Sequence, residues 1–148
     1  LSQQLGVVVL GSQAEQCKSL FPFPIYPMNY VSNEKELVDI YNAVDLYVTP
    51  SLQDNLPNTI VEAMACGIPC VGFNVGGIPQ MIDHLHNGYV AQYKSADDLA
   101  NGICWTLTEG DYETLSSEAY RKAVTTYSEA TVASQYIQIY NHITGKNA

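Results

Sequence analysis

Apolar residues along this chain gather in short runs that alternate with amphipathic stretches. Continuous apolar runs over Leu5–Leu10 and Cys70–Phe73 predict strands buried on both faces, which is typical of a parallel sheet covered by helices. Shorter extended segments are predicted at Phe23–Tyr26, Leu46–Thr49 and Tyr89–Ala91. The pattern therefore predicts an α/β domain with about five short parallel strands.

The segments between and after these strands show helical spacing. Ser32 or Asn33 can cap a helix whose apolar residues fall on one face, which we expect to pack on the sheet. The last predicted helix, after Ser128, carries an apolar stripe that we expect to pack for the most part on the domain's own sheet. The alternative is that the stripe includes a surface covered by another domain. The other helices are predicted over Pro57–Cys66, Pro79–His84, Ser95–Leu107 and Tyr112–Thr126, with a weak helical stretch over Gln13–Leu20.

The most unusual residue choices lie in the segment Asp45–Gln80. Prolines and short polar residues break the chain after the Leu46–Thr49 strand. Pro57 suits the first position of the following helix, and Gly67 suits the position just past its end. Because open α/β sheets bind ligands beyond the carboxyl ends of their strands, this loop and helix are the predicted ligand site.

Two carboxylates accompany the start of this helix. Glu62 is the only charge within a mostly apolar helix, and Asp54 lies in the loop before it, with seven residues between the two. The first-turn N–H groups of Asn58, Thr59 and Ile60 point out of the helix and attract anions. Carboxylates can accept hydrogen bonds from sugar hydroxyls, and the neighbouring N–H groups can bind a phosphate, so this combination suits a phosphorylated sugar. The alternatives are that Glu62 only points to solvent and that Asn58 and Thr59 are ordinary first-turn residues.

Paired glycines follow the strand Cys70–Phe73. Gly76 and Gly77 allow the backbone to approach a ligand closely or to adopt a positive φ. A simple tight turn is the alternative.

The same stretch resembles the C-terminal, donor-binding domain of GT-B glycosyltransferases, specifically glycosyltransferase family 4. The resemblance is carried by TPSLQDNLPNTIVEAMACGIPCVGFNVGGIPQMI, continues through HNGYVA and extends loosely over residues 5–142. It implies a Rossmann-like three-layer sandwich in which Asp54 contacts the sugar hydroxyls of the donor and Glu62 its ribose. The family usually has Glu at the first position and at Gln80, so Asp54 is one methylene shorter and Gln80 keeps only a hydrogen-bonding side chain.

The resemblance implies a retaining transfer of sugar from a nucleotide-sugar, either a UDP- or a GDP-sugar, in cell-surface glycan or polysaccharide synthesis. The N-terminus of the Pro57 helix would stabilise the leaving diphosphate. Since the chain has no Asp-x-Asp sequence, we expect no obligatory metal, and no cofactor besides the donor substrate. The candidate catalytic residues are Asp54 and Glu62, and the candidate donor-binding residues are Asn55, Leu56, Asn58, Thr59, Ile60, Gly76 and Gly77.

Other functions fit the same pattern. One alternative is another enzyme of the same fold, a nucleotide-sugar epimerase or a phosphorylase. A second alternative is a non-catalytic module that binds a nucleotide or another protein. The pattern does not determine the base, the sugar, the acceptor or the linkage.

The length of the chain bounds its organisation. Its 148 residues suit one domain, 1–148, and are too few for a two-domain GT-B enzyme. The resemblance implies a donor domain truncated at its N-terminus that lacks the strand between Leu5–Leu10 and Leu46–Thr49. Those two strands would pair directly, leave a gap, or recruit a strand from a partner such as a second copy. An acceptor glycan or lipid-linked sugar would bind through the absent N-terminal domain, so we expect the isolated chain to be inactive.

The net charge of the chain excludes some classes of binding partner. With 6 Lys and Arg against 15 Asp and Glu, the net charge of −9 argues against nucleic acid or an anionic membrane surface. No basic residue lies between Lys35 and Lys94, whereas the resemblance places the cations for the diphosphate on the missing first strand and loop.

We expect all four cysteines to be small buried apolar residues of a protein in a reducing compartment.

We expect a cytoplasmic location, peripheral to the membrane in the full-length enzyme, because the chain shows neither a signal peptide nor an apolar run of about 18 residues. His84 and His86 suit a surface turn better than a metal site. The aromatic residues of the segment Phe21–Tyr30 could be core or could line the base pocket. The cysteines are Cys17, Cys66, Cys70 and Cys104.

Overall fold

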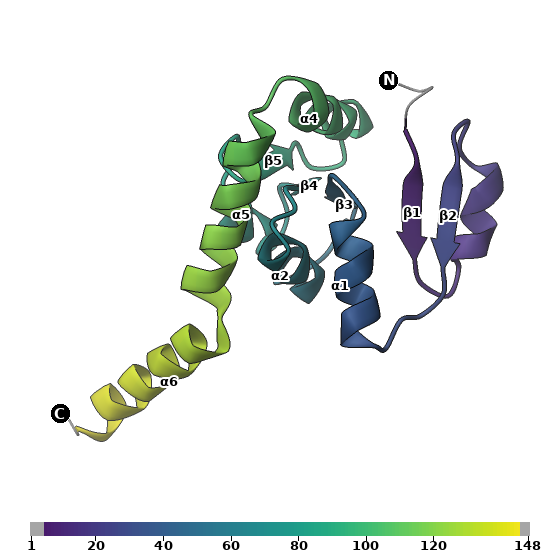
Figure 1. Ribbon diagram of the computed structural model, residues 1–148. Coiled ribbons are helices and arrows are strands. Elements are labelled where there is room, and N and C mark those ends of the chain that lie inside the picture. Colours follow the sequence, from purple (N-terminus) through teal and green to yellow (C-terminus); the bar gives the residue numbers. More distant parts are fainter. Residues whose placement is uncertain (1–4, 146–148) are drawn as a thin grey trace. The chain divides into compact units, whose positions relative to one another are not determined.

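The computed structural model describes residues 5–145, which fall into an N-terminal unit that ends at Val44 and a C-terminal unit that begins at Asp45 (Figure 1). All five strands pair in parallel, as the sequence predicts. They form two sheets, β1-β2 and β3-β4-β5, and not the single sheet that was expected. Direct pairing of the first and third strands is therefore not found in residues 5–145, because those strands belong to different units.

The N-terminal unit is a short parallel ribbon covered by one turn-rich segment. Strand β1 (Val7–Leu10) pairs with β2 (Ile25–Met28), and the 3₁₀ helix η1 (Ala14–Ser19) between them packs on both strands. Helix α1 (Glu34–Asn42) follows. Its cap Asn33 accepts hydrogen bonds from the N–H groups two and three residues later, at 2.9 and 3.2 Å. The predicted cap is thus confirmed.

Aromatic residues before α1 do not form a core. Phe21, Tyr26 and Tyr30 are 44%, 57% and 84% exposed, so of the two alternatives the core is excluded for these three side chains. Aromatic character alone cannot distinguish the two cases, because the rings of Phe and Tyr are common in cores and at binding surfaces.

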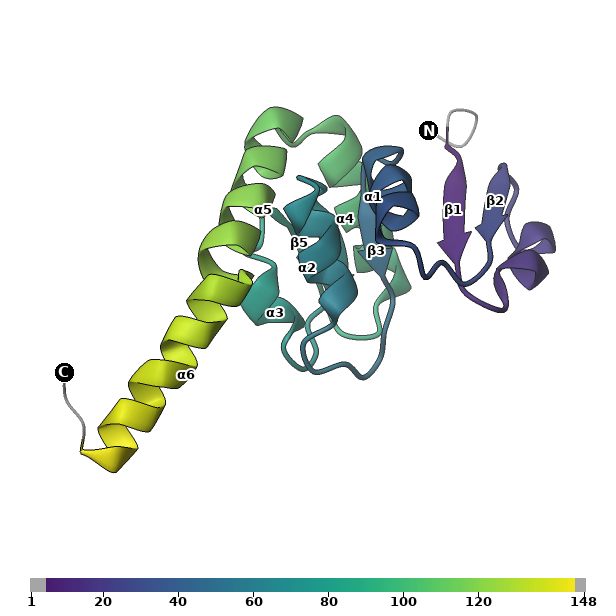
Figure 2. The ribbon, with the colours of Figure 1, turned by 60° about the horizontal axis from the view of Figure 1, so that its bottom comes forward.

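The C-terminal unit is a three-layer sandwich. Strand β4 (Cys70–Phe73) is buried along its whole length and lies between β3 (Tyr47–Thr49) and β5 (Gly88–Ala91). Helix α2 (Asn58–Ala65) covers one face of this sheet and α4 (Ala96–Thr108) covers the other (Figures 1 and 2). Helix α5 (Tyr112–Tyr127) packs on α2, and the remaining helices are α3 (Ile78–Met81) and α6 (Glu129–Thr144).

The helix ends follow the local sequence closely. Helix α2 begins at Asn58, one residue after the predicted start, so Pro57 is its N-cap, and Gly67 has a φ of +73° after its end. The Ser95 hydroxyl accepts from the N–H of Asp98 at 3.2 Å and caps α4. Helix α3 is shorter than predicted because the chain is already extended at Ile82.

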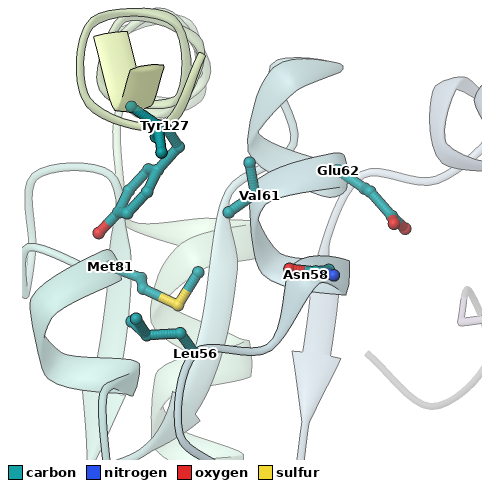
Figure 3. Close-up of a pocket in the computed structure, with 7 residues that line it drawn as sticks. Leu56, Asn58, Val61, Glu62, Met81 and Tyr127 are labelled. Carbon is teal, nitrogen blue, oxygen red and sulfur yellow. The ribbon is translucent and has the colours of Figure 1, made fainter. Parts of the chain in front are cut away.

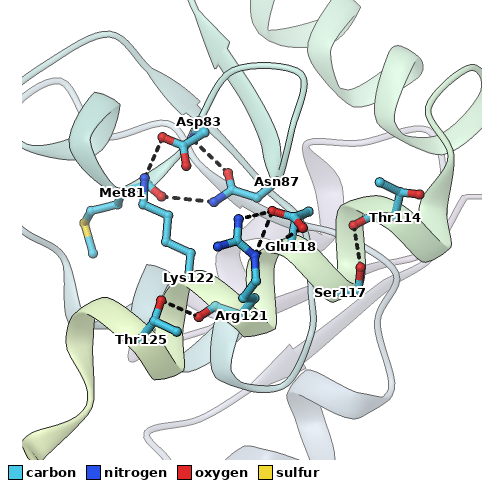
Figure 4. Close-up of polar contacts among 9 residues, drawn as sticks. All are labelled: Met81, Asp83, Asn87, Thr114, Ser117, Glu118, Arg121, Lys122 and Thr125. Carbon is cyan, nitrogen blue, oxygen red and sulfur yellow. Dashed lines mark hydrogen bonds and ion pairs between the residues drawn. The ribbon is translucent and has the colours of Figure 1, made fainter. Parts of the chain in front are cut away.

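Helix α5 is tied to the corner between α3 and β5 (Figure 4). The Lys122 ammonium lies 2.6 Å from the Asp83 carboxylate. In the same corner the Asn87 side chain, only 1% exposed, accepts from the N–H of Asp83 at 2.8 Å and donates to the Met81 carbonyl at 3.3 Å. The predicted Asn87-Gly88 turn is therefore a buried corner in which both ends of the amide are bonded.

Two expectations about burial are wrong. The stripe on α6 does not pack on the sheet: Tyr136, Ile139, Tyr140 and Ile143 are 56–74% exposed. Helical spacing predicts a shared face but not what covers it. Of the four cysteines only Cys70 is buried, and Cys104 is exposed. Burial raises the pKa of the Cys70 thiol.

Within residues 5–145, no helix combines the length and the hydrophobicity that a bilayer span requires.

Candidate functional site

The predicted site lies where β3 ends and α2 begins. Thr49 is buried at the end of β3, and its hydroxyl donates to that of Ser51 at 3.1 Å. The loop that follows, residues 50–57, contains neither helix nor strand. Asp54 is half-buried in this loop, so its position depends on contacts with other segments.

The glycine turn after β4 supplies one such contact. A Cβ added at Gly76 would lie 1.6 Å from the carbonyl oxygen of Asp54, and one at Gly77 would lie 2.0 Å from that of Asn55. Gly76 also has a φ of +55°. The predicted positive φ is therefore confirmed at Gly76, whereas the close approach is made to the protein's own loop, and approach to a ligand stays a prediction. The structure thereby brings Asp54, Asn55, Gly76 and Gly77 together.

Tyr47, at the start of β3, reaches the first turn of α2. Its hydroxyl donates to the Thr59 hydroxyl at 2.8 Å, in the first turn of α2. Burial raises the pKa of Tyr47, the hydrogen bond to Thr59 lowers it, and the negative charges of Glu62 and Asp54 raise it. Tyr47 thus ties the end of the sheet to the first turn of α2, the helix that carries Glu62. Sequence reasoning missed Tyr47, because a tyrosine in a strand is ordinarily only a core residue.

A cavity of about 360 Å³ borders the first half of α2 (Figure 3). Leu56, Val61, Met81 and Tyr127 form its apolar side in the figure, while the Glu62 carboxylate points away from them. Sequence reasoning anticipated only part of this lining, because its residues come from segments far apart in the chain. The full lining is Leu56, Asn58, Val61, Glu62, Met81, Tyr127 and Val132.

One predicted anion donor is wrong. The N–H of Ile60 already donates to the Pro57 carbonyl at 3.0 Å, which closes the first turn of α2. The Ile60 side chain is fully buried as well. Ile60 is therefore a core residue, and the first-turn positions that face outward are Asn58 and Thr59, both exposed.

The family follows from comparison with known proteins. A model of the family described as "Glycosyl transferases group 1" matches residues 2–109. The chain belongs to this family. One relative is an N,N'-diacetylbacillosaminyl-diphospho-undecaprenol alpha-1,3-N-acetylgalactosaminyltransferase from Campylobacter jejuni, 26% identical over 97% of this chain and 39% of its own length. Another is an N-acetyl-alpha-D-glucosaminyl L-malate synthase from Bacillus anthracis, 28% identical over 75% of this chain and 29% of its own. The chain thus spans well under half the length of these relatives.

Solved structures agree on the fold. Sucrose-phosphate synthase from Thermosynechococcus elongatus aligns with a TM-score of 0.79 at 21% identity, over 97% of this chain and 39% of its own. Anabaena HepE, solved with UDP-glucose, aligns with a TM-score of 0.75 at 21% identity, over 94% of this chain and 41% of its own. The C-terminal domain of a group 1 glycosyl transferase from Francisella tularensis aligns at 0.66 and 14%, over 87% of this chain and 89% of that domain. The fold is the C-terminal half of a GT-B glycosyltransferase, as the resemblance implied.

Proposed function

We propose that this domain holds the nucleotide-sugar donor of a retaining glycosyltransferase. The observation that carries the proposal is the arrangement around α2: the glycine turn holds the Asp54 loop, and Leu56 of that loop lines the same cavity as Asn58 and Glu62 of the helix. An acid from the loop and an acid from the helix thus share one neighbourhood, at the edge of the sheet where α/β folds bind ligands.

Each residue then has a defined task. Asp54 accepts hydrogen bonds from the transferred sugar, and Glu62 accepts from the ribose hydroxyls. The first turn of α2, with Asn58 and Thr59, faces the diphosphate, where the positive end of the helix dipole stabilises the charge that develops on the leaving group. Asn55, Gly76 and Gly77 maintain the loop, and Leu56 lines the adjoining cavity. General acid–base groups would come from the acceptor side of the longer enzyme.

The substrate class rests on the known relatives. HepE was solved with UDP-glucose, which supports a UDP-sugar as donor, with a GDP-sugar as the other candidate. The Campylobacter relative is named for an undecaprenol-linked acceptor, which supports a glycan or lipid-linked sugar as acceptor and a role in cell-surface glycan synthesis at the cytoplasmic side of a membrane. The acceptor would bind outside this domain, and two copies of the domain could pair through an exposed face.

Calorimetric titration tests the proposal. UDP-, GDP- and ADP-sugars are titrated into the protein in its full natural length, and we expect one nucleotide class to bind. Glu62→Ala should weaken that binding about ten-fold or more, because a hydrogen bond to a charged group is lost. Glu109→Ala, which removes an exposed carboxylate at the end of α4, is the matched control and should bind normally. Equal affinity of the Glu62→Ala variant and the unmutated protein for all nucleotides would favour a non-catalytic module instead.

A further inference from the structure

Three loops follow the three parallel strands of the C-terminal unit: residues 50–57 after β3, 74–77 after β4 and 92–95 after β5. Because parallel strands place their carboxyl ends at one edge of the sheet, these loops are neighbours. The first of them carries Asp54 and lacks regular structure, so its path depends on contacts with neighbouring segments. The glycine turn is one support, since it touches the backbone at Asp54 and Asn55.

Tyr93 is the second support. Its hydroxyl donates to the carbonyl oxygen of Leu52 at 3.1 Å, a contact between residues 41 positions apart. Leu52 lies just before Asp54, so the loop is held by Tyr93 on one side and by Gly76 on the other. Both contacts are made to loop backbone, which fixes the path of the chain and not only one side chain.

The turn that carries Tyr93 is itself well fixed. The N–H of Gln92 donates to the Asp98 carboxylate at 2.6 Å, and the N–H of Ser95 donates to the Gln92 carbonyl at 3.0 Å. Lys94 has a φ of +62°, and its ammonium lies 5.0 Å from the centre of the Tyr93 ring, in the geometry of a cation–π contact. A left-handed conformation in a residue other than glycine persists where its surroundings enforce it. Tyr93 is therefore presented from a rigid base.

We propose that Tyr93 is a positioning residue that holds the Asp54 loop in the geometry needed by the donor sugar. The part of the inference that concerns the donor rests on the proposed function. The physical reason is that a carboxylate on an irregular loop contributes to recognition only when its backbone is held in place, and small displacements are costly. Tyr93 acts through the Leu52 carbonyl, so its effect falls on the group that Asp54 contacts, the sugar, and not on the nucleoside diphosphate.

The first experiment tests the mechanical part independently of any ligand. In protein labelled with ¹⁵N-leucine, Leu52 and Leu56 flank Asp54, and the buried Leu115 of α5 serves as internal reference. Tyr93→Phe should lower the order parameter at Leu52 from about 0.85 to below about 0.6, the range of flexible backbone. Tyr120→Phe, which removes a hydroxyl from an exposed tyrosine on α5, is the matched control. An unchanged order parameter at Leu52 in the Tyr93→Phe variant overturns the inference.

The second experiment separates positioning from general destabilisation. UDP-glucose, GDP-mannose, UDP and GDP are titrated into unmutated protein, Tyr93→Phe and Tyr120→Phe. Tyr93→Phe should weaken the affinity for the nucleotide-sugar that binds about five-fold, as the loss of one hydrogen bond predicts. It should leave the affinity for the corresponding nucleoside diphosphate unchanged. Equal losses for both, or none, overturn the inference. If the unmutated protein binds none of the four and no ADP-sugar either, the proposed function fails, while the leucine measurement still decides the mechanical role of Tyr93.

Discussion

Gly76 shows how a single residue can decide the geometry of this site. Its backbone combines a left-handed φ with contact to the Asp54 carbonyl, so a side chain would meet two obstacles at once. Gly145 has a similar φ of +66°, but an added Cβ would find nothing within 4 Å. Comparing substitutions at Gly76 and Gly145 therefore separates the cost of backbone strain from the cost of a steric clash.

Gly76→Ala should lower the free energy of unfolding by about 3 kcal/mol, since overpacking adds to the strain of a positive φ. Gly145→Ala should lower it by about 1 kcal/mol, from strain alone. Urea denaturation of both variants measures the difference. Similar losses would mean that the Asp54 loop yields readily to a methyl group at Gly76.

Tyr47 should make stability sensitive to alkaline pH. Its pKa is raised in the folded protein, chiefly by burial and also by nearby carboxylates, so the folded state favours the protonated hydroxyl. That contribution is fully present below the pKa of an unfolded tyrosine, about 10, and is lost as pH rises through the higher folded value. The stability advantage of the unmutated protein over Tyr47→Phe should therefore shrink above about pH 10. Urea unfolding at a series of pH values tests this, and a constant advantage would contradict it.

At the scale of elements, local patterns predict which segments are helical but not what each helix meets. The predicted stripe on α6 is exposed, whereas α5 packs on α2 and reaches the corner after α3. Periodicity reports the face that a helix offers, and the partner is decided by residues elsewhere in the chain. The same limit explains why Lys122 and Asp83 could not be paired from sequence.

Two neighbouring cations on α5 provide a matched test of how this helix docks. The Lys122 side chain is 14% exposed and reaches Asp83, whereas Arg121 is 63% exposed and pairs with Glu118 on its own helix. Lys122→Ala should lower the free energy of unfolding by about 1 kcal/mol, because it removes a partly buried ion pair between two elements. Arg121→Ala should cause no measurable change. Equal effects in thermal or urea unfolding would mean that the Asp83 contact does not stabilise the docking of α5.

At the scale of the whole molecule, the chain contains the part of the enzyme that we assign to donor binding. It spans 39% of the length of its Campylobacter relative, and the candidate acids, the glycine turn and the cavity all lie in the C-terminal unit. A transfer reaction also needs an acceptor held against the donor, and we propose that the groups that hold it lie outside this domain.

The 148-residue chain should therefore bind its nucleotide-sugar without transferring the sugar. Incubation with radiolabelled UDP-glucose or GDP-mannose, in the presence of lipid-linked and free glycan acceptors, should yield no labelled glycan. The same assay on the protein in its full natural length is the comparison. Turnover by the 148-residue chain would show that donor and acceptor sites both lie within it.

The sequence by itself determined the elements and their order, because caps and strand patterns act within a few residues: Asn33 caps α1 and Ser95 caps α4 through bonds to their own first turns. It also indicated the family, whose motif lies in one continuous segment. Only the tertiary structure decided that Ile60 is core, that Gly76 meets the Asp54 carbonyl and that Tyr93 holds Leu52. These contacts join segments far apart in the chain, and a local pattern contains no information about which distant backbone will fill the space beside it.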